Sequence, residues 1–110
     1  MHIKDQNRLD SIHEAVLKIE SYTSVFQNAD QLNDNNIAFD ATMMNFVIIG
    51  EMVNKLSVDF KNQYPEVEWQ KIKGLRNIAA HDYFGIDAEE VWQIIHKYLT
   101  ALKEFIEKRI

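Results

Sequence analysis

The sequence of 110 residues contains no cysteine, one proline and three glycines. The absence of cysteine excludes disulfide bonds, zinc sites built on thiolates and thiol nucleophiles, and it suits a reducing cytoplasm. So few prolines and glycines are typical of a helical protein with few tight turns. The longest apolar run, Phe46 to Gly50, is far below the ~20 residues that span a bilayer, and Met1 to Arg8 has no apolar signal core. We therefore expect a soluble, cytoplasmic protein without a membrane anchor.

Basic residues are also scarce, with 12 lysines and arginines against 17 aspartates and glutamates and a formal net charge of −5. This balance argues against indiscriminate binding to nucleic acid, because such affinity comes largely from lysines and arginines that release counterions from phosphates. It leaves room for a local basic site. Lys71, Lys73 and Arg76 form the densest cationic cluster in the middle of the chain, just before His81. Any contact with RNA is expected to centre there.

Apolar residues recur at helical spacing in four segments of the chain. They recur every three or four residues in segments 5–26 and 69–81, and they cover most of the helix circumference in 37–56. The fourth segment follows residue 87 and has a predicted core stripe of Ala88, Val91, Ile95, Tyr98, Leu102 and Phe105. A chain of this length holds about one domain. The pattern therefore predicts a single all-α domain over residues 1–110, a four- to five-helix up-and-down bundle.

Local signals mark where these helices begin and end. The polar run 28–36 is rich in asparagine and aspartate, so we expect a loop there. Ser57 is expected to cap a short extra turn, and Asp87 with Glu90 forms a variant of the capping box at the start of the last helix. Residues 46–49 could also form a strand, because valine and isoleucine favour strands. Helical spacing continues on both sides of them, so we prefer the helix.

One short segment, Arg76 to Tyr83, contains residue types that can cleave RNA. Attack of a ribose 2′-hydroxyl on the neighbouring phosphate needs a group that moves protons near neutral pH and a cation that stabilises the phosphorane charge. We therefore take His81 and Arg76 as the candidate catalytic pair, with Asn77 placed to hold a phosphate oxygen or to orient the histidine. This scheme needs no metal and no cofactor. His13 with Glu14, and Glu90 with His96, lack the spacing of three or four residues that brings metal ligands onto one helix face, and nothing resembles the H-E-x-x-H motif.

The spacing of this pair raises a geometric problem. At about 100° per residue, Arg76 and His81 lie roughly 140° apart around an unbroken helix, whereas Arg76 and Tyr83 share one face. An unbroken helix is therefore expected to separate the two catalytic groups. Either the helix ends near Ala80 and lets His81 turn back, or a two-fold dimer completes one cleft with residues from both subunits. We favour the contribution of a homodimer.

The segment Arg76-Asn77-Ile78-Ala79-Ala80-His81-Asp82-Tyr83 resembles the R-x4-H-x-Y motif of HepT-like toxins in the HEPN superfamily. Similarity extends over most of the chain, from Phe39-Asp40-Ala41 through Ile49-Gly50-Glu51 to Val91-Trp92. The resemblance implies a metal-independent endoribonuclease, a HEPN-like helical bundle that dimerises to form the RNA-cleaving cleft. It also implies that Arg76 and His81 are the catalytic pair and that Asn77 is the polar residue beside them.

A partner and a covalent modification are implied by the same resemblance. Such toxins are encoded with a minimal nucleotidyltransferase antitoxin, which resembles an enzyme that transfers AMP from ATP onto the motif tyrosine, here Tyr83. The added group would place negative charge where the RNA phosphate must sit. The alternative is a noncatalytic helical module that binds RNA or a protein through the same groove. Burial of Arg76 and His81 in separate environments would favour that module.

Two residues are candidates for supporting the site. Glu51 lies in the most apolar helix, where a buried carboxylate is costly unless it is paired, and Arg76 is its expected partner. Lys73 is the second, as a cation close to the motif. Gly74 lies inside the third expected helix, where glycine costs about 1 kcal/mol relative to alanine. Its presence suggests close packing or a ligand that approaches the backbone.

Overall fold

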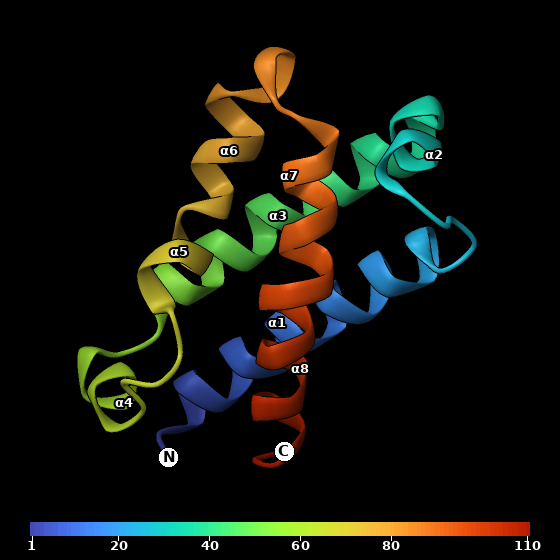
Figure 1. The fold of residues 1–110 in the computed structure, drawn as a ribbon. Coiled ribbons are helices and arrows are strands. Elements are labelled where there is room, and N and C mark those ends of the chain that lie inside the picture. Colours follow the sequence, from blue (N-terminus) through green and yellow to red (C-terminus); the bar gives the residue numbers. More distant parts are fainter.

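The computed structural model describes residues 1–110, and it consists of helices and connecting turns without any strand. Two long helices, α1 (Ile3–Thr23) and α3 (Asn36–Lys55), pack against each other. The shorter helices are α2 (Ala29–Asp34), α4 (Val58–Gln63), α5 (Trp69–Lys73), α6 (Leu75–His81), α7 (Ala88–Gln93) and α8 (Thr100–Glu107). Figure 1 shows the C-terminal helix crossing the α1 and α3 pair and both termini at one end of the molecule. The predicted all-α fold class is confirmed.

Helix α3 is the central helix of this bundle. It contacts α1 on one side and α5 and α6 on another, and its buried residues include Phe46, Ile49 and Val53. Asn35 caps its first turn, because the Asn35 side chain accepts a hydrogen bond from the backbone N–H of Ala38 at 3.0 Å. Length and composition alone would also allow α3 to cross a membrane. The core helix of a soluble protein passes the same test, and 44% of this window of α3 is buried inside the chain.

The segment 28–36 is not the loop that its composition predicts, because it contains helix α2. Asn28 caps α2 by accepting a hydrogen bond from the N–H of Gln31 at 3.0 Å. The two apolar residues of the segment, Ala29 and Leu32, are buried, and Leu32 holds the turn against the core. The asparagines that suggested a loop therefore act as caps, a role that suits their short polar side chains equally well.

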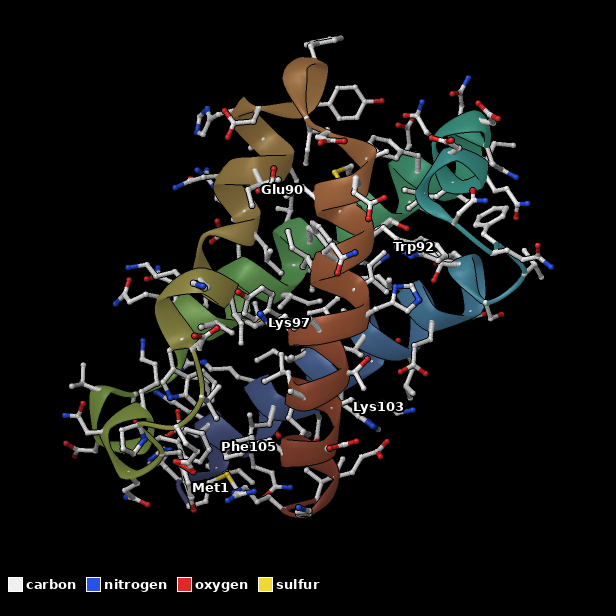
Figure 2. All side chains as sticks on the ribbon, viewed as in Figure 1. Met1, Glu90, Trp92, Lys97, Lys103 and Phe105 are labelled. Carbon is white, nitrogen blue, oxygen red and sulfur yellow. The ribbon has the colours of Figure 1, made fainter.

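The last helix deviates from the predicted stripe because it changes pitch. Residues Ile94–Leu99 form a π-helical stretch between α7 and α8. A π turn holds one extra residue, so every later residue is rotated relative to an ideal α-helix. Leu99 and Ile106 consequently enter the core, while the predicted core residues Tyr98 and Phe105 lie at its rim, partly buried. The partly buried Phe105 lies on α8, where Figure 2 labels it.

Two capping predictions have different outcomes. Ser57 caps α4 as expected, by accepting a hydrogen bond from the N–H of Phe60 at 3.1 Å. Asp87 caps α7, but through the N–H of Glu89 at 2.9 Å, and the side chain of Glu90 makes no return bond. The start of the last helix is therefore a simple cap and not a capping box.

A buried carboxylate that the sequence did not reveal joins α1 to α4. Asp5 is 3% exposed and accepts hydrogen bonds from the backbone N–H of Ser57 at 2.9 Å and from its hydroxyl at 2.7 Å. Burial acts to raise the pKa of Asp5, but these two hydrogen bonds and the nearby Arg8 outweigh it and hold that pKa below its usual value. The cap residue of α4 is thus itself held in place from α1.

Candidate functional site

Helix α6 carries the three residues of the candidate catalytic cluster. Nη1 of Arg76 lies 3.5 Å from Nε2 of His81 and 3.4 Å from Oδ1 of Asn77, to which it donates a hydrogen bond. All three residues are exposed to solvent. An arginine, a histidine and an amide therefore meet on one open surface within a single chain, where a phosphate could reach them.

The expected separation of Arg76 and His81 is wrong. Helix α6 continues unbroken through His81, which is the arrangement that was expected to separate the two groups. The two side chains nevertheless converge. The Cα atoms are displaced by about 7.5 Å along the axis at 1.5 Å per residue, and a long arginine side chain can cover that distance and bend around the helix. Neither an early helix end at Ala80 nor a partner subunit is needed to bring the pair together.

Glu51 on α3 holds the guanidinium group of Arg76. Its Oε1 lies 2.9 Å from Nε of Arg76, which leaves Nη1 to face Asn77 and His81. The expected burial of Glu51 is wrong, because its side chain is 41% exposed and that of Arg76 is 45% exposed. An ion pair this exposed is screened by solvent and contributes at most about 1 kcal/mol to stability. Its main consequence is therefore the orientation of Arg76.

Gly50 lets α3 approach the base of the cluster. A Cβ atom at this position would lie 2.7 Å from both N and Cβ of Arg76 and 2.9 Å from the carbonyl oxygen of Lys73. The chain bends nearby at Gly74, which breaks the single helix predicted for 69–81 into α5 and α6. The predicted end of this helical segment near His81 is confirmed. The close approach of the α3 backbone to the backbone at Arg76 thus fixes the position from which the Arg76 side chain extends.

Tyr83 follows the cluster in a 3-10 turn, Tyr83–Gly85, and is anchored to α3. Its hydroxyl donates a short hydrogen bond to Oδ1 of Asp40, which raises the pKa of Tyr83 above its usual value. The ring packs edge-on against Phe39 at 6.0 Å between centroids and against Phe84 at 5.2 Å. Phe84 itself is fully exposed. The motif tyrosine is thus partly buried and oriented by α3.

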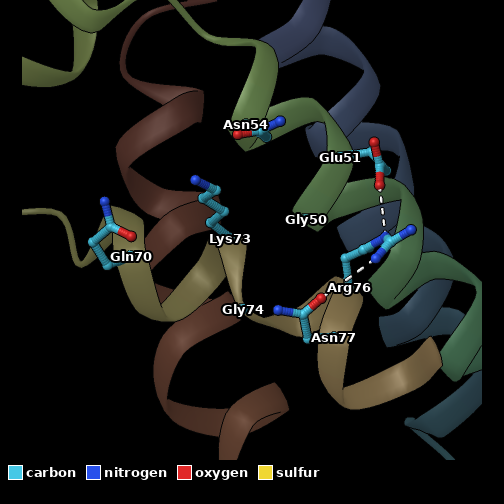
Figure 3. Close-up of a pocket in the computed structure, with 8 residues that line it drawn as sticks. All are labelled: Gly50, Glu51, Asn54, Gln70, Lys73, Gly74, Arg76 and Asn77. Atoms are coloured by element: carbon cyan, nitrogen blue, oxygen red, sulfur yellow. Dashed lines mark hydrogen bonds and ion pairs between the residues drawn. The ribbon is translucent and has the colours of Figure 1, made fainter. Parts of the chain in front are cut away.

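A polar pocket of about 450 Å³ adjoins the cluster between α3 and the α5–α6 segment. Figure 3 shows its eight lining residues, none of which is hydrophobic: Gly50, Glu51, Asn54, Gln70, Lys73, Gly74, Arg76 and Asn77. Lys73 therefore lies beside the cluster, as expected. Lys71, its neighbour in the predicted cationic group, instead donates a hydrogen bond to Tyr98 at 2.8 Å.

Sequence reasoning missed four residues that shape this site. Asp40 and Gly50 lie within segments that carry the family resemblance, but their contacts with Tyr83 and Arg76 span two different helices. A glycine within so apolar a helix was the one available signal of close packing. Asn54 and Gln70 are ordinary exposed amides in the sequence, and only the fold places them in one pocket.

Comparison with known proteins gives a consistent result. The family model described as Ribonuclease HepT-like matches residues 12–109. A probable HepT ribonuclease of Thermococcus cleftensis is 33% identical over 100 residues, which are 91% of this chain and 90% of that protein. A candidate RNase of Methanocaldococcus jannaschii is 31% identical over 99 residues, 90% of each chain. No solved structure matches this chain significantly.

Proposed function

This chain belongs to the HepT-like ribonuclease family, and from that premise we propose that it cleaves RNA without a metal ion, using Arg76 and His81. One observation carries the proposal. The arginine and the histidine, with Asn77 beside them, lie within 3.5 Å of one another on an open surface of one chain. A nonfunctional helix surface has no need of such an arrangement, and the phosphodiester of an RNA strand fits it chemically.

The proposed reaction uses the 2′-hydroxyl of the substrate as nucleophile. His81, as the neutral imidazole, takes the proton of that hydroxyl while its oxygen attacks the adjacent phosphorus. The bond from phosphorus to the 5′-oxygen breaks, and that oxygen leaves with a proton from solvent or from the imidazolium. The products are a 2′,3′-cyclic phosphate and a 5′-hydroxyl. Arg76 stabilises the added negative charge on the phosphorane.

Two neighbours prepare Arg76 for this role. Glu51 holds Nε, so the guanidinium group keeps one orientation, and Nη2, which forms no hydrogen bond within the chain, remains available to a phosphate oxygen. Asn77 accepts a hydrogen bond from Nη1 through Oδ1, and its amide nitrogen remains free to donate to the substrate. Such prior positioning of charge contributes to catalysis because the protein does not have to reorganise during the reaction.

The noncatalytic binding module is the second candidate, and the geometry favours the enzyme over it. Burial of Arg76 and His81 in separate environments would have supported the module. Both residues are instead exposed and adjacent. An RNA-binding surface needs only separate cations along a strand, whereas an arginine paired with a histidine adds the capacity to move a proton.

We further propose a cytoplasmic toxin role, with inhibition by a nucleotidyltransferase antitoxin that modifies Tyr83. The phenol oxygen would attack the α-phosphorus of ATP, the α–β phosphoanhydride bond would break, and pyrophosphate would leave. Asp40, which already accepts the hydrogen bond of Tyr83, is placed to take the proton. The resulting phosphodiester adds one negative charge two residues from His81, where it would repel RNA and occupy the site.

A homodimer is proposed because α3 leaves an apolar stripe uncovered. Ile37 is 85% exposed and Met44 59% exposed, and the partly buried Ile48 continues their line along the helix. At about 100° per residue, Asp40 and Glu51 lie within roughly 60° of this stripe. A second copy packed on the stripe would bring two catalytic clusters close to one interface. Ile37→Asp combined with Met44→Asp is expected to yield a monomer in light scattering, whereas an unchanged mass would contradict this interface.

The test of the ribonuclease proposal is cleavage of a mixed RNA pool in the presence of EDTA. Wild type is expected to cleave and to leave 2′,3′-cyclic phosphate ends, and His81→Ala is expected to lose this activity while it remains folded. His96→Ala is the matched control, since His96 is also exposed but lies on the C-terminal helix away from the cluster. Equal cleavage by His81→Ala and His96→Ala, or none by wild type, would shift the preference to the binding module.

A further inference from the structure

The pocket beside the catalytic cluster has a composition that identifies its ligand class. Arg76 and Asn77 belong both to the cluster and to the pocket wall, so a ligand in the pocket is continuous with one at the cluster. Its volume of about 450 Å³ lies within the ordinary range of small-molecule sites. A nucleotide next to the scissile phosphate would therefore fit in it.

Lys73 supplies the one uncommitted charge in this pocket. The single carboxylate among the lining residues, Glu51, is engaged by Arg76, and Lys73 forms no hydrogen bond or ion pair within the chain. Figure 3 shows its side chain extending between Asn54 and Gln70. Lys61 lies close enough for the positive charge of Lys73 to add to the effect of burial in lowering the pKa of Lys61. A local excess of positive charge thus exists in a chain with a net charge of −5.

The remaining lining residues favour the sugar and phosphate of a nucleotide over its base. Asn54, Gln70 and Asn77 offer amide donors and acceptors that match ribose hydroxyls and phosphate oxygens. No aromatic or aliphatic side chain lines the pocket. Sequence-specific readers of single-stranded RNA usually stack an unpaired base on an aromatic ring or an arginine plane, and Arg76 is already held by Glu51.

We propose that this pocket is a ribose-phosphate subsite for the nucleotide adjoining the cleaved bond, with Lys73 binding its phosphate and Gln70 and Asn54 binding its sugar. The proposal rests on the ribonuclease function and adds to it. It assigns RNA affinity to a place outside the catalytic pair. It also means that this pocket binds RNA of any sequence with equal affinity, so that a preference for particular bases would have to arise elsewhere.

Binding of short fluorescent oligo(A) and oligo(U) RNAs, measured by anisotropy over a series of NaCl concentrations, tests the subsite. All variants carry His81→Ala, which prevents cleavage during the titration. Lys73→Ala is compared with Lys71→Ala, which removes the same charge from the same helix outside the pocket of interest. Lys73→Arg keeps the charge, and Gln70→Ala removes an amide. Circular dichroism confirms that each variant is folded.

Lys73→Ala is expected to lower the affinity for both RNAs by about tenfold, the loss typical of one charge-assisted hydrogen bond. It should also reduce the slope of log affinity against log salt by about 0.7, which corresponds to one phosphate contact on a single strand. Lys73→Arg should restore most of the affinity, and Gln70→Ala should weaken oligo(A) and oligo(U) equally.

Two results would overturn the subsite. Equal RNA affinity and equal salt dependence of Lys73→Ala and Lys71→Ala would show that the pocket does not bind phosphate. A change in the ratio of oligo(A) to oligo(U) affinity in Gln70→Ala would show that the pocket recognises bases. Cleavage by wild type in EDTA is measured separately. If wild type cleaves RNA but Lys73 does not affect binding, the subsite alone is wrong. If wild type cleaves no RNA, the ribonuclease proposal fails first.

Discussion

Replacing Gly50 with alanine tests whether close packing of α3 on α6 positions the catalytic arginine. The new Cβ would lie 2.7 Å from the backbone N of Arg76 and 2.9 Å from the carbonyl oxygen of Lys73, well inside an ordinary contact of about 3.5 Å. Two of the three nearest atoms belong to the backbone, so no side-chain rotation relieves the overlap. The α5–α6 segment must therefore move away from α3 by several tenths of an ångström.

The expected magnitude follows from two opposing effects. Overpacking of this kind costs about 1 to 3 kcal/mol, while alanine gains about 1 kcal/mol over glycine in a helix interior. We expect a net loss of up to about 2 kcal/mol, and each kcal/mol lowers the melting temperature by roughly 4 to 8 °C in a domain of this size. Because the shift carries Arg76 with it, cleavage should fall by about tenfold or more, since displacing a positioned group by roughly 1 Å costs about a hundredfold.

Gly85→Ala is the matched control for Gly50→Ala. A Cβ at Gly85 would have no neighbour within 4 Å, and its φ is not positive, so alanine fits there without strain. Its stability should stay within about 0.5 kcal/mol of wild type. Thermal melts followed by circular dichroism, and cleavage assays at a temperature where both variants are folded, separate stability from activity. The reasoning is refuted if Gly50→Ala melts like Gly85→Ala and cleaves like wild type.

Three further predictions concern residues that surround the cluster. Glu51→Gln should lower the cleavage rate with little change in melting temperature, because the exposed ion pair mainly orients Arg76; a stability loss above about 1 kcal/mol would show a structural role instead. Asp5→Asn should destabilise the fold by about 1 to 3 kcal/mol, because an amide keeps only one acceptor oxygen for the two hydrogen bonds that Ser57 donates. Since the pKa of Asp5 is lowered in the folded state, its stabilisation is present above about pH 4 and disappears as the pH falls through the folded pKa; urea melts between neutral and acidic pH should show this decline in wild type and a flatter profile in the variant. Tyr83→Phe should retain cleavage and lose any transfer of AMP from ATP in the presence of a nucleotidyltransferase antitoxin, and labelling that persists on the variant would move the modification to another residue.

The helices and the motif could be predicted from sequence because both are local features. Apolar spacing located α1 and α3 to within three residues at each end, and the arginine and histidine lie in one short segment. Errors arose where a local pattern has two physical outcomes. Asparagines near a chain turn can form a loop or cap a helix, and in 28–36 they cap α2 and α3. The spacing of apolar residues in the sequence does not reveal a π-helical stretch, so the rotation that it causes is seen only in the structure.

The contacts that organise the site could not be predicted, because they join distant parts of the chain. Asp40 meets Tyr83 across 43 residues, and Glu51 reaches Arg76 from another helix. Periodicity says which face of a helix is apolar, but not which polar residues at the edge of that face will meet. The convergence of Arg76 and His81 was missed for a different reason. Helix angles place the Cα atoms, whereas the long arginine side chain decides where the charge lies.

The most direct test of the central claim is a mixing experiment on RNA cleavage in EDTA. Arg76→Ala and His81→Ala are each expected to be inactive, and the account places both required groups in one chain. Unfolding and refolding the two variants together therefore yields no chain with a complete pair, and the mixture is predicted to remain as inactive as either variant while refolded wild type cleaves. Recovery of a substantial fraction of wild-type cleavage in the mixture would show that arginine and histidine come from different subunits, which would contradict the account.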